Sequence, residues 1–387
     1  MKKPWMKRWM AAGLSAVLLA GLSGCGSAQN EQNASKETSA RIGFITAYTG
    51  PGSAYGQAMK DGVDLAVREI NSNPGTRVKI DLVTYDTKLN KTEAISAMKK
   101  ALEQDKVLAV EGPMTSGEMM AAGPVAQQLK TVAFGTGPTA PGITDIGDYI
   151  FRNAVPGELS TPIVIRKAES ALHFKTAAVL YSSNNDQAVS ENQIYQSLLR
   201  EMGVQIVDTE TFADKDTDFS AQLTSIQSKN PDVLMIIAGL YQEGALIMKK
   251  AREMGMNQPV IGSNGFNSPA YLKLAGSSAE GTIAATPWNP DKKTEKAQHF
   301  RQAFFEAYNH EPDQFAAQAY DAMYLIHEAV EKSGSVTDRK KFRDTLAGIK
   351  DFEGATGQFA FDEKRNPQMD LDILTVRGGK WVPMTAE

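Results

Sequence analysis

The stretch RIGFITAYTGPGSAYGQAMKDGVDLAVREI, residues 41–70, decides the fold of this chain. It opens with a short apolar run over residues 42–46, which is typical of a buried strand. From residue 54 to 70, apolar side chains recur at spacings of three and four, which predicts an amphipathic helix. A strand that leads directly into a helix is the first half of a parallel crossover unit.

The same alternation continues along most of the chain and forms two series. The first series has predicted strands at 78–85, 107–110 and 131–134 and predicted helices at 92–104 and 118–129. The second begins after Pro156, with predicted helices at 159–172, 189–202, 219–228 and 244–254 and strands at 177–181, 205–211, 233–238 and 259–261. Three more helices (294–308, 314–332 and 338–347) and strand-like pieces at 357–361 and 371–376 follow. The pattern predicts an α/β fold of two doubly wound parallel-sheet lobes.

The length and composition of the chain argue against several classes of function. A chain of 387 residues with 42% apolar and 22% charged residues is too long for one compact core and predicts two domains. One Cys and four His leave no disulfide and little material for a metal, so we expect neither metal nor cofactor. The formal charge of −4 includes a basic leader, so the rest of the chain is acidic and should not bind nucleic acid.

The N-terminal segment predicts the compartment. Residues 1–24 combine a basic start with an apolar run at 10–22 that is too short to span a bilayer, which is typical of a signal peptide. The sequence LSGC (22–25) resembles the bacterial lipobox, in which the Cys, here Cys25, becomes lipidated after cleavage. Residues 25–40 are polar and aperiodic, as in a flexible tether. We therefore expect a lipid-anchored, extracytoplasmic protein whose globular part begins at Arg41, on the periplasmic face or the outer surface according to the host envelope.

Ligands of open parallel sheets bind beyond the carboxyl ends of the strands, so those loops are the candidate site. Loop 49–56 does not follow the G-x-G-x-x-G spacing, and its Tyr55 either faces the cleft or packs in the core. In loop 111–118, Thr115 and Glu118 form a capping-box pattern, and the free amides there, with the Ser116 hydroxyl, suit a carboxylate. The alternative is a cap that serves only the helix.

A third loop, residues 135–141, is rich in Gly, Pro and Thr. Its composition lets the backbone at Gly137 and the hydroxyl of Thr139 approach a ligand closely.

Short motifs along the chain, taken together, resemble those of a known family. The motifs are TGP (49–51) with YG (55–56), LAVREIN (65–71), GP (112–113) with TS (115–116), TAPGIT (139–144), FRN (151–153) with Pro156, NPD (230–232), AREMG (251–255), AG (275–276) with AEG (279–281), and AYDA (319–322). Together, over residues 41–379, they resemble the leucine/isoleucine/valine-binding type of solute receptor in ABC importers, a two-lobed periplasmic binding protein of type I.

The resemblance implies a set of site residues. Ser116 and Thr139, with the backbone at Gly137, match the positions that hold the α-carboxylate of the ligand in the family. Tyr55 matches an aromatic residue that covers the ligand side chain, and Tyr241 stands at or next to a second one. Asp186 lies in a loop where a Tyr-Gly pair is usual.

Asn264 is the main departure, because it stands where these receptors carry a Glu that pairs with the ligand ammonium. A neutral amide binds an ammonium group more weakly than a carboxylate does. If Asp186, Glu158 or Glu243 reaches the cleft, an amino acid of the branched-chain class remains the expected ligand. If none does, the pocket suits a carboxylate without an amine, aromatic or aliphatic, or an amide.

The resemblance also implies a hinged trap that delivers its ligand to a membrane ABC permease. We expect lobe 1 to comprise residues 41–156 and 287–356, lobe 2 to comprise 157–286 and 357–387, and the hinge to have three strands near Pro156, Pro287 and Gly357. We expect a monomer. No catalytic motif occurs, so we do not expect an enzyme. A receptor that passes its bound form to a separate sensor is the alternative function.

Overall fold

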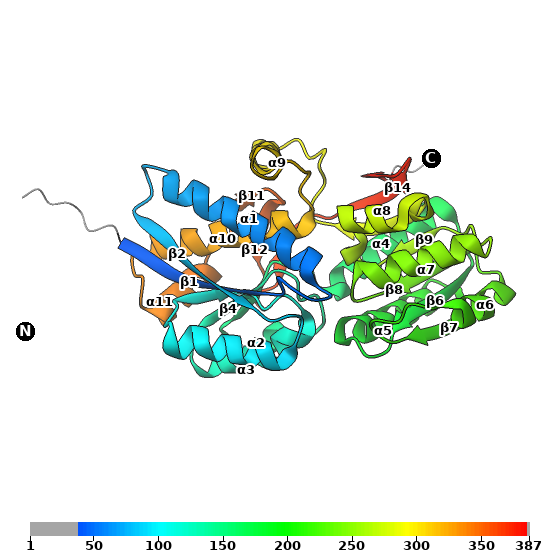
Figure 1. Cartoon of the computed structure of the whole chain (residues 1–387), viewed down its shortest axis with the longest axis horizontal. Coiled ribbons are helices and arrows are strands. Elements are labelled where there is room, and N and C mark those ends of the chain that lie inside the picture. The colour runs from blue at the N-terminus through cyan, green and yellow to red at the C-terminus, as the bar shows by residue number, and fades with distance from the viewer. Residues whose placement is uncertain (1–37, 385–387) are drawn as a thin grey trace, which may run out of the picture. The chain divides into compact units, whose positions relative to one another are not determined.

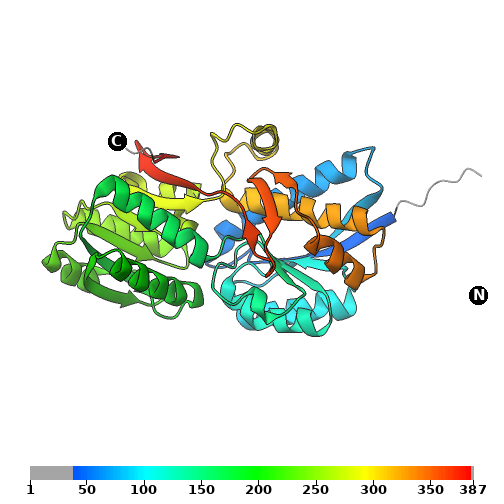
Figure 2. The ribbon, with the colours of Figure 1, turned by 180° about the vertical axis from the view of Figure 1, so that it is seen from behind.

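A computed structural model describes residues 38–384, which belong to one compact unit. Cys25 and the predicted leader lie outside these residues. Figure 1 shows two lobes, each with a sheet between layers of helices, and Figure 2 shows the same arrangement from behind. The α/β fold with two parallel-sheet lobes is therefore confirmed.

The first lobe has a five-stranded sheet in which all neighbouring strands are parallel, in the order β2-β1-β3-β4-β5. Its strands are β1 (Thr38–Thr46), β2 (Val78–Asp86), β3 (Ala109–Glu111), β4 (Val132–Gly135) and β5 (Ile150–Arg152). Its helices are α1 (Ser53–Ser72), α2 (Lys91–Lys99), α3 (Ser116–Gln128), α9 (Glu295–Tyr308), α10 (Gln314–Ser333) and α11 (Arg339–Ala347). Strand β1 begins at Thr38, the first residue that the structure describes, three residues before Arg41.

Both faces of this sheet are buried because β1 alternates its side chains between two cores. Ile42 and Phe44 pack with α1 and α10 on one face, while Ile45 packs with α2 and α3 on the other. Such burial on both sides is what a parallel sheet requires. The predicted helix at 92–104 consists of α2 followed by a short π-helical turn at Lys100–Gln104.

The second lobe has a seven-stranded sheet in the order β15-β14-β10-β9-β8-β6-β7. Its strands are β6 (Thr176–Ser182), β7 (Gln205–Phe212), β8 (Val233–Ile237), β9 (Val260–Gly262), β10 (Thr282–Thr286), β14 (Asp372–Arg377) and β15 (Lys380–Pro383). Its helices are α4 (Gly157–Leu172), α5 (Asp186–Glu201), α6 (Ser220–Lys229), α7 (Tyr241–Glu253) and α8 (Pro269–Ala275). The strands from β7 to β10 are parallel, whereas β14 and β15 add an antiparallel hairpin at one edge.

The hairpin turns at Gly378 and Gly379, whose φ angles are 59° and 74°. Two positive φ angles in a row are what a tight hairpin turn of this hand needs, and glycine adopts them without strain.

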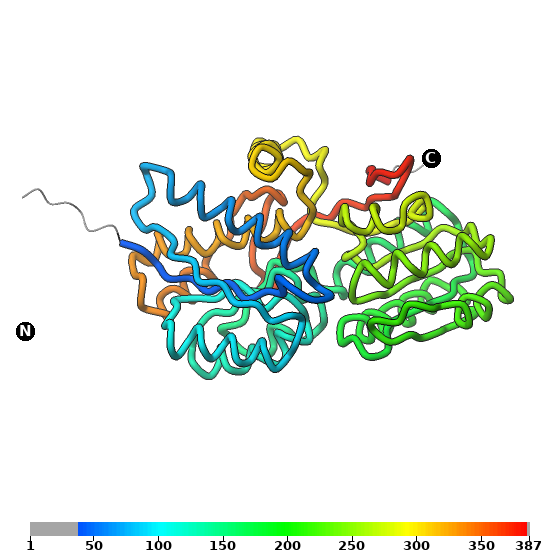
Figure 3. The backbone as a smooth tube through the Cα atoms, in the orientation of Figure 1, coloured from blue at the N-terminus to red at the C-terminus, as the bar shows by residue number. Residues whose placement is uncertain are grey.

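The chain crosses between the lobes three times, and Figure 3 follows its path. The first crossing joins β5 to α4 and the second joins β10 to α9. The third comes later than the predicted position at Gly357. Strand β12 (Gly357–Phe361) pairs with β11 (Phe352–Gly354) and β13 (Pro367–Gln368).

Phe361 explains why this small sheet stays with the first lobe. Its ring centroid lies 5.3 Å from that of Phe151 and 6.0 Å from that of Phe134, both in the first core. Arg365, further along, donates to the carbonyl oxygen of Ile150 at 3.1 Å. The third crossing therefore lies between β13 and β14, and residues 357–368 belong with the first lobe.

The core of the second lobe holds a buried acid at the contact between α4 and α5. Glu191 is 9% exposed and accepts hydrogen bonds from Thr161, at 3.4 Å, and from Gln187. Burial disfavours the charged form and raises the pKa of Glu191 to about 7.

This raised pKa makes the stability of the protein depend on pH. The unfolded chain releases the proton near the ordinary value of 4.5, but the folded chain holds it up to about 7. The free energy of unfolding should therefore fall as the pH rises through this window, with a slope of up to about 1.4 kcal/mol per pH unit from this group, and level off above it. Glu191→Gln should remove that slope, as urea unfolding at several pH values would measure.

Glu201→Gln is the matched control, because Glu201 lies on the same helix with its side chain 67% exposed. That variant should keep the pH dependence of the wild type. An unchanged slope in Glu191→Gln would contradict the assignment of the buried proton.

Candidate functional site

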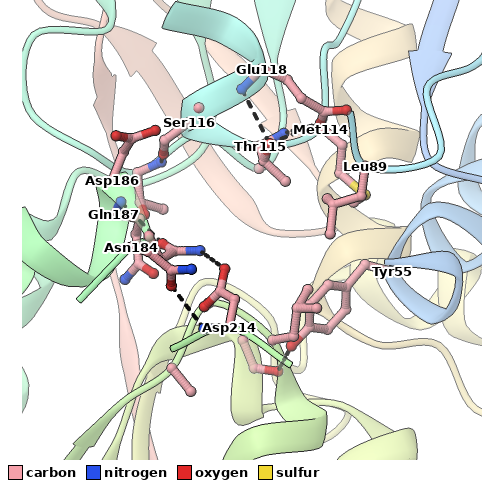
Figure 4. Close-up of a pocket in the computed structure, with 18 of the residues that line it drawn as sticks. Tyr55, Leu89, Met114, Thr115, Ser116, Glu118, Asn184, Asp186, Gln187 and Asp214 are labelled. Carbon is pink, nitrogen blue, oxygen red and sulfur yellow. Dashed lines mark hydrogen bonds between the residues drawn. The ribbon is translucent and has the colours of Figure 1, made fainter. Parts of the chain in front are cut away.

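A cavity of about 320 Å³ lies between the lobes at the carboxyl ends of the parallel strands (Figure 4). Six of the seven predicted ligand-binding residues line it, namely Tyr55, Ser116, Gly137, Thr139, Asp186 and Asn264. The fold brings these positions together because the carboxyl ends of neighbouring parallel strands meet at one edge of each sheet.

The first lobe contributes the start of α3, where the predicted capping box is present. The Thr115 hydroxyl accepts from the amide of Glu118 at 3.3 Å, and the Glu118 carboxylate accepts from the Thr115 amide at 3.2 Å. The amides of Ser116 and Gly117 have no protein partner among residues 38–384. Free amides and the positive end of the helix dipole favour an anion at this point.

Ser116 connects this helix to the loop after β4. Its side-chain oxygen accepts hydrogen bonds from the amides of Thr139 and Ala140, both at 3.1 Å. Since a hydroxyl also has one proton to donate, Ser116 remains able to donate a hydrogen bond to an anion in the cavity. Ser116 is 4% exposed, so such a bond would form in a site shielded from water.

Gly137 permits the close approach of the two loops. A Cβ atom at this position would lie only 2.2 Å from the main-chain oxygen of Met114, so no other residue fits. The neighbouring Thr139 is 8% exposed, and its carbonyl oxygen accepts from the amide of Gly157 at 2.9 Å. The loop after β4 is therefore tied directly to the first crossing between the lobes.

One wall of the cavity is apolar and aromatic. Tyr55 and Phe315 stand side by side, with ring centroids 4.5 Å apart, and Leu89, Met114 and Leu240 complete the wall. Figure 4 shows Tyr55, Met114 and Leu89 on the same side of the cavity. Phe315 lies on α10, far in sequence from the loops at the strand ends, and only the packing of that helix brings it here.

Tyr241 does not line the cavity, contrary to the prediction that it contacts the ligand. Leu240, the residue before it, takes that place. The ring of Tyr241 packs edge-on against Tyr55 at a centroid distance of 5.4 Å, so it supports the wall from behind. The one-residue difference arises because α7 begins at Tyr241 and turns its side chain away.

The opposite wall belongs to the second lobe and is polar. It is formed by Asn184, Asn185, Asp186, Gln187 and Asp214. Asn264 of the same lobe also lines the cavity, and its carbonyl oxygen accepts from Gln314 of the first lobe. The side chain of Asn185 caps α5 by accepting from the amides of Gln187 and Ala188. Asp214 could not be predicted from the sequence, because it lies in a polar surface-like loop after β7 that carries no motif.

Asp186 reaches the cavity but is not a free charge. Its carboxylate accepts from the ammonium group of Lys91 at 2.6 Å, a pair that links α5 of one lobe to α2 of the other. Glu158 and Glu243 do not line the cavity. Glu158 is exposed on α4, and Glu243 is 3% exposed and accepts from the amide of Lys215 at 2.9 Å.

The lobes touch at several points around the cavity. The Tyr55 hydroxyl donates to the carbonyl oxygen of Gly265 at 2.9 Å, and Gln242 donates to that of Pro51 at 2.7 Å. Gln314 donates to the carbonyl oxygen of Asn264 at 2.7 Å. These contacts, with the pair of Lys91 and Asp186, join the two walls.

Residues 38–384 hold no cluster of three or more His, Cys, Asp or Glu side chains suited to a metal ion. None of their helices has both the length and the apolar character that a membrane span needs.

Comparisons with known proteins agree with this architecture. The family described as "Periplasmic binding protein" matches residues 39–380. A Leu/Ile/Val-binding protein of Rhizobium johnstonii is 26% identical, covering 83% of this chain and 87% of its own. A branched-chain amino acid transporter substrate-binding protein of Streptococcus pneumoniae, solved with isoleucine, superimposes with a TM-score of 0.84 at 31% identity, over 89% of this chain and 98% of its own.

A solute-binding protein of R. palustris, solved with benzoate, shares the fold with a TM-score of 0.82 at 22% identity, over 89% of this chain and 95% of its own. The family consists of solute-binding proteins and not enzymes. On its sequence and its fold, this chain belongs to the periplasmic binding protein family, in the type I branch that includes the Leu/Ile/Val-binding proteins.

Proposed function

We propose that this protein is the extracytoplasmic solute-binding component of an ABC importer and that it captures a small carboxylate. The observation that carries the proposal is the donor group at the start of α3. There the Ser116 hydroxyl and the amides of Ser116 and Gly117 border a cavity between two lobes. Donors that are held in place before binding suit an anion that must leave water.

Capture would work by closure of the lobes about the three crossings. The donor group lies on the first lobe, whereas Asn264 and the polar wall lie on the second. A ligand that touches both walls stabilises the closed form by the contacts that it makes only there. The closed form would then dock on a membrane permease, which receives the ligand.

An amino acid of the branched-chain class is our preferred ligand. The wall formed by Tyr55, Phe315, Leu89, Met114 and Leu240 suits an aliphatic side chain, and the structural neighbour from Streptococcus pneumoniae holds isoleucine. A carboxylate without an amine is the second candidate. Two features support it: Asn264 is neutral, and Lys91 already pairs with Asp186.

The membrane attachment is also part of the proposal. Cys25 would carry the lipid, and residues 25–40 would tether the binding unit to the membrane surface, so that the protein works beside its permease. Two or three acyl chains provide durable anchoring, because each buried methylene contributes about 0.8 kcal/mol.

The site assignment predicts the effect of removing single hydroxyl groups. Ser116→Ala and Thr139→Ala should each weaken ligand binding by about 1 to 3 kcal/mol, because each removes a hydrogen bond to a charged group. Isothermal titration with the ligand found in the screen below would measure this. Ser96→Ala, a change at an exposed Ser on α2, is the control and should keep the wild-type affinity. Wild-type affinity in both site variants would refute the assignment.

The ligand class is testable by thermal shift. The midpoint of unfolding should rise with the concentration of a ligand that binds only the native form, by RT ln(1 + [L]/Kd) in free energy. We expect a shift with leucine and none with benzoate, when the chain from residue 26 onward is screened against amino acids, aromatic acids, short carboxylates and amides. A benzoate shift without a leucine shift would favour the second candidate.

The lipid anchor predicts a covalent change at one residue. Cells that express the full chain should incorporate labelled palmitate into the wild type but not into Cys25→Ala. Ser23→Ala keeps the cysteine and serves as the control that should still be labelled. Labelling of Cys25→Ala at the wild-type level would refute lipidation at this position.

A further inference from the structure

Asp214 is an acid on the second-lobe wall of the cavity. It lies in the loop between β7 and α6, is half-buried and lines the cavity. Figure 4 shows its side chain reaching from the second lobe into the space between Asn184 and Tyr55.

The surrounding residues hold the carboxylate of Asp214 in a defined position. One of its oxygens accepts from the hydroxyl of Ser182 at 2.5 Å, and the other accepts from the side-chain amide of Asn185 at 3.0 Å. The main-chain amide of Asp214 donates to the side-chain oxygen of Asn184 at 2.8 Å. Ser182 is fully buried at the end of β6, so the carboxylate is anchored to the sheet itself.

The other acids near the cavity already have partners. Glu118 is used in the cap of α3, and Asp186 is paired with Lys91. Glu243 faces the amide of Lys215 and does not line the cavity. Asp214, by contrast, takes part in no ion pair of the described structure, and the two side chains that hold it are neutral. Glu118 likewise forms no ion pair, but it is 2% exposed and held by Thr115 of its own cap, so Asp214 is the more exposed of the two cavity acids that lack a cationic partner.

A carboxylate that is partly removed from water and held only by neutral donors favours a cation beside it. The two lysine side chains that line the cavity near this wall do not provide the cation. Lys91 is paired with Asp186, and Lys215, although it follows Asp214 directly, forms no ion pair with it at a distance of 4 Å or less. A cationic group of a bound ligand would balance the charge.

We propose that Asp214 binds a primary ammonium group of the ligand and so makes the protein select zwitterionic carboxylates. The inference rests on the proposed function, since it needs the ligand carboxylate to lie at Ser116 and the start of α3. Asp214 would then take over, from a different strand end, the charge that Asn264 lacks. Because Ser116 and Asp214 lie on different lobes, a zwitterion would join both walls and favour the closed form.

Isothermal titration of the full chain with matched pairs of probes tests this. One pair is L-leucine and 4-methylpentanoate, and the other is 5-aminopentanoate and pentanoate. The two members of each pair differ only in the amine. The wild type should bind at least one amine-bearing probe about tenfold or more tightly than its amine-free partner. The pair that shows this preference tells whether the ammonium is next to the carboxylate or at the far end of the ligand.

Asp214→Asn should abolish the preference by weakening the amine-bearing probe about tenfold or more while leaving its partner unchanged. Asp214→Glu keeps the charge and should keep the sign of the preference. Asp216→Asn, in the same loop but outside the cavity lining, is the matched control and should bind like the wild type. Unfolding midpoints near that of the wild type would show that each variant is folded.

Different results would contradict the role of Asp214 and the proposed capture of a carboxylate. A wild-type preference for the amine-free probes, or an Asp214→Asn protein that retains the preference for the amine, would overturn the role of Asp214 while carboxylate capture stands. Ser116→Ala should weaken both members of a pair equally, because it acts on the carboxylate. Equal affinity of Ser116→Ala and wild type for every probe would overturn the proposed function and the inference with it.

Discussion

The oxygen of Ser116 accepts hydrogen bonds from the amides of Thr139 and Ala140, and this contact joins the two loops on which the first-lobe half of the site is built. This contact is possible only because residue 137 is a glycine. A side chain at Gly137 would collide with the main-chain oxygen of Met114 and keep the loops apart. Ser116 and Gly117, whose amides are free, then both border the cavity. Such preorganisation reduces what must be ordered when a ligand binds.

The two walls of the cavity differ in chemistry. The aromatic and aliphatic wall around Tyr55 and Phe315 is largely buried and favours apolar surface in any orientation. The wall of Asn184, Asn185 and Asp214 imposes directional hydrogen bonds and a negative charge. A ligand with one apolar side and one charged side matches this arrangement better than a ligand with a single character.

Closure depends on contacts that are individually modest. The pair of Lys91 and Asp186 is short, at 2.6 Å, but its side chains are 59% and 42% exposed, and such a pair contributes at most about 1 kcal/mol. The bond from Tyr55 to Gly265 and the bond from Gln242 to Pro51 add neutral hydrogen bonds of similar size. Under the proposed function, weak contacts between the lobes would let a bound ligand set the equilibrium between open and closed forms.

Much of this protein follows from local sequence. The alternation of apolar runs and helical periods predicted the two parallel sheets, since period and length are local properties. The spacing of Thr115 and Glu118 predicted the start of α3. The positions of the strand ends predicted that Ser116, Gly137 and Thr139 lie at the site. What local pattern did not determine was decided by packing. Phe361 holds residues 357–368 in the first lobe by contact with Phe151, more than 200 residues away, so the third crossing moves beyond β13.

Packing between distant parts of the chain also explains why the site differs from the sequence-based prediction. Leu240 and not Tyr241 lines the cavity, because the start of α7 sets which side chain faces the cavity. Phe315 lies on α10, and the position of that helix depends on the whole core of the first lobe. Asp186 is neutralised by Lys91 of the other lobe, and Asp214 carries no motif. The sequence by itself determined the lobes and the loops that border the start of α3, because these depend on neighbours in the chain. Only the tertiary structure decided which charges remain unpaired, because pairing depends on residues that are distant in sequence and close in space.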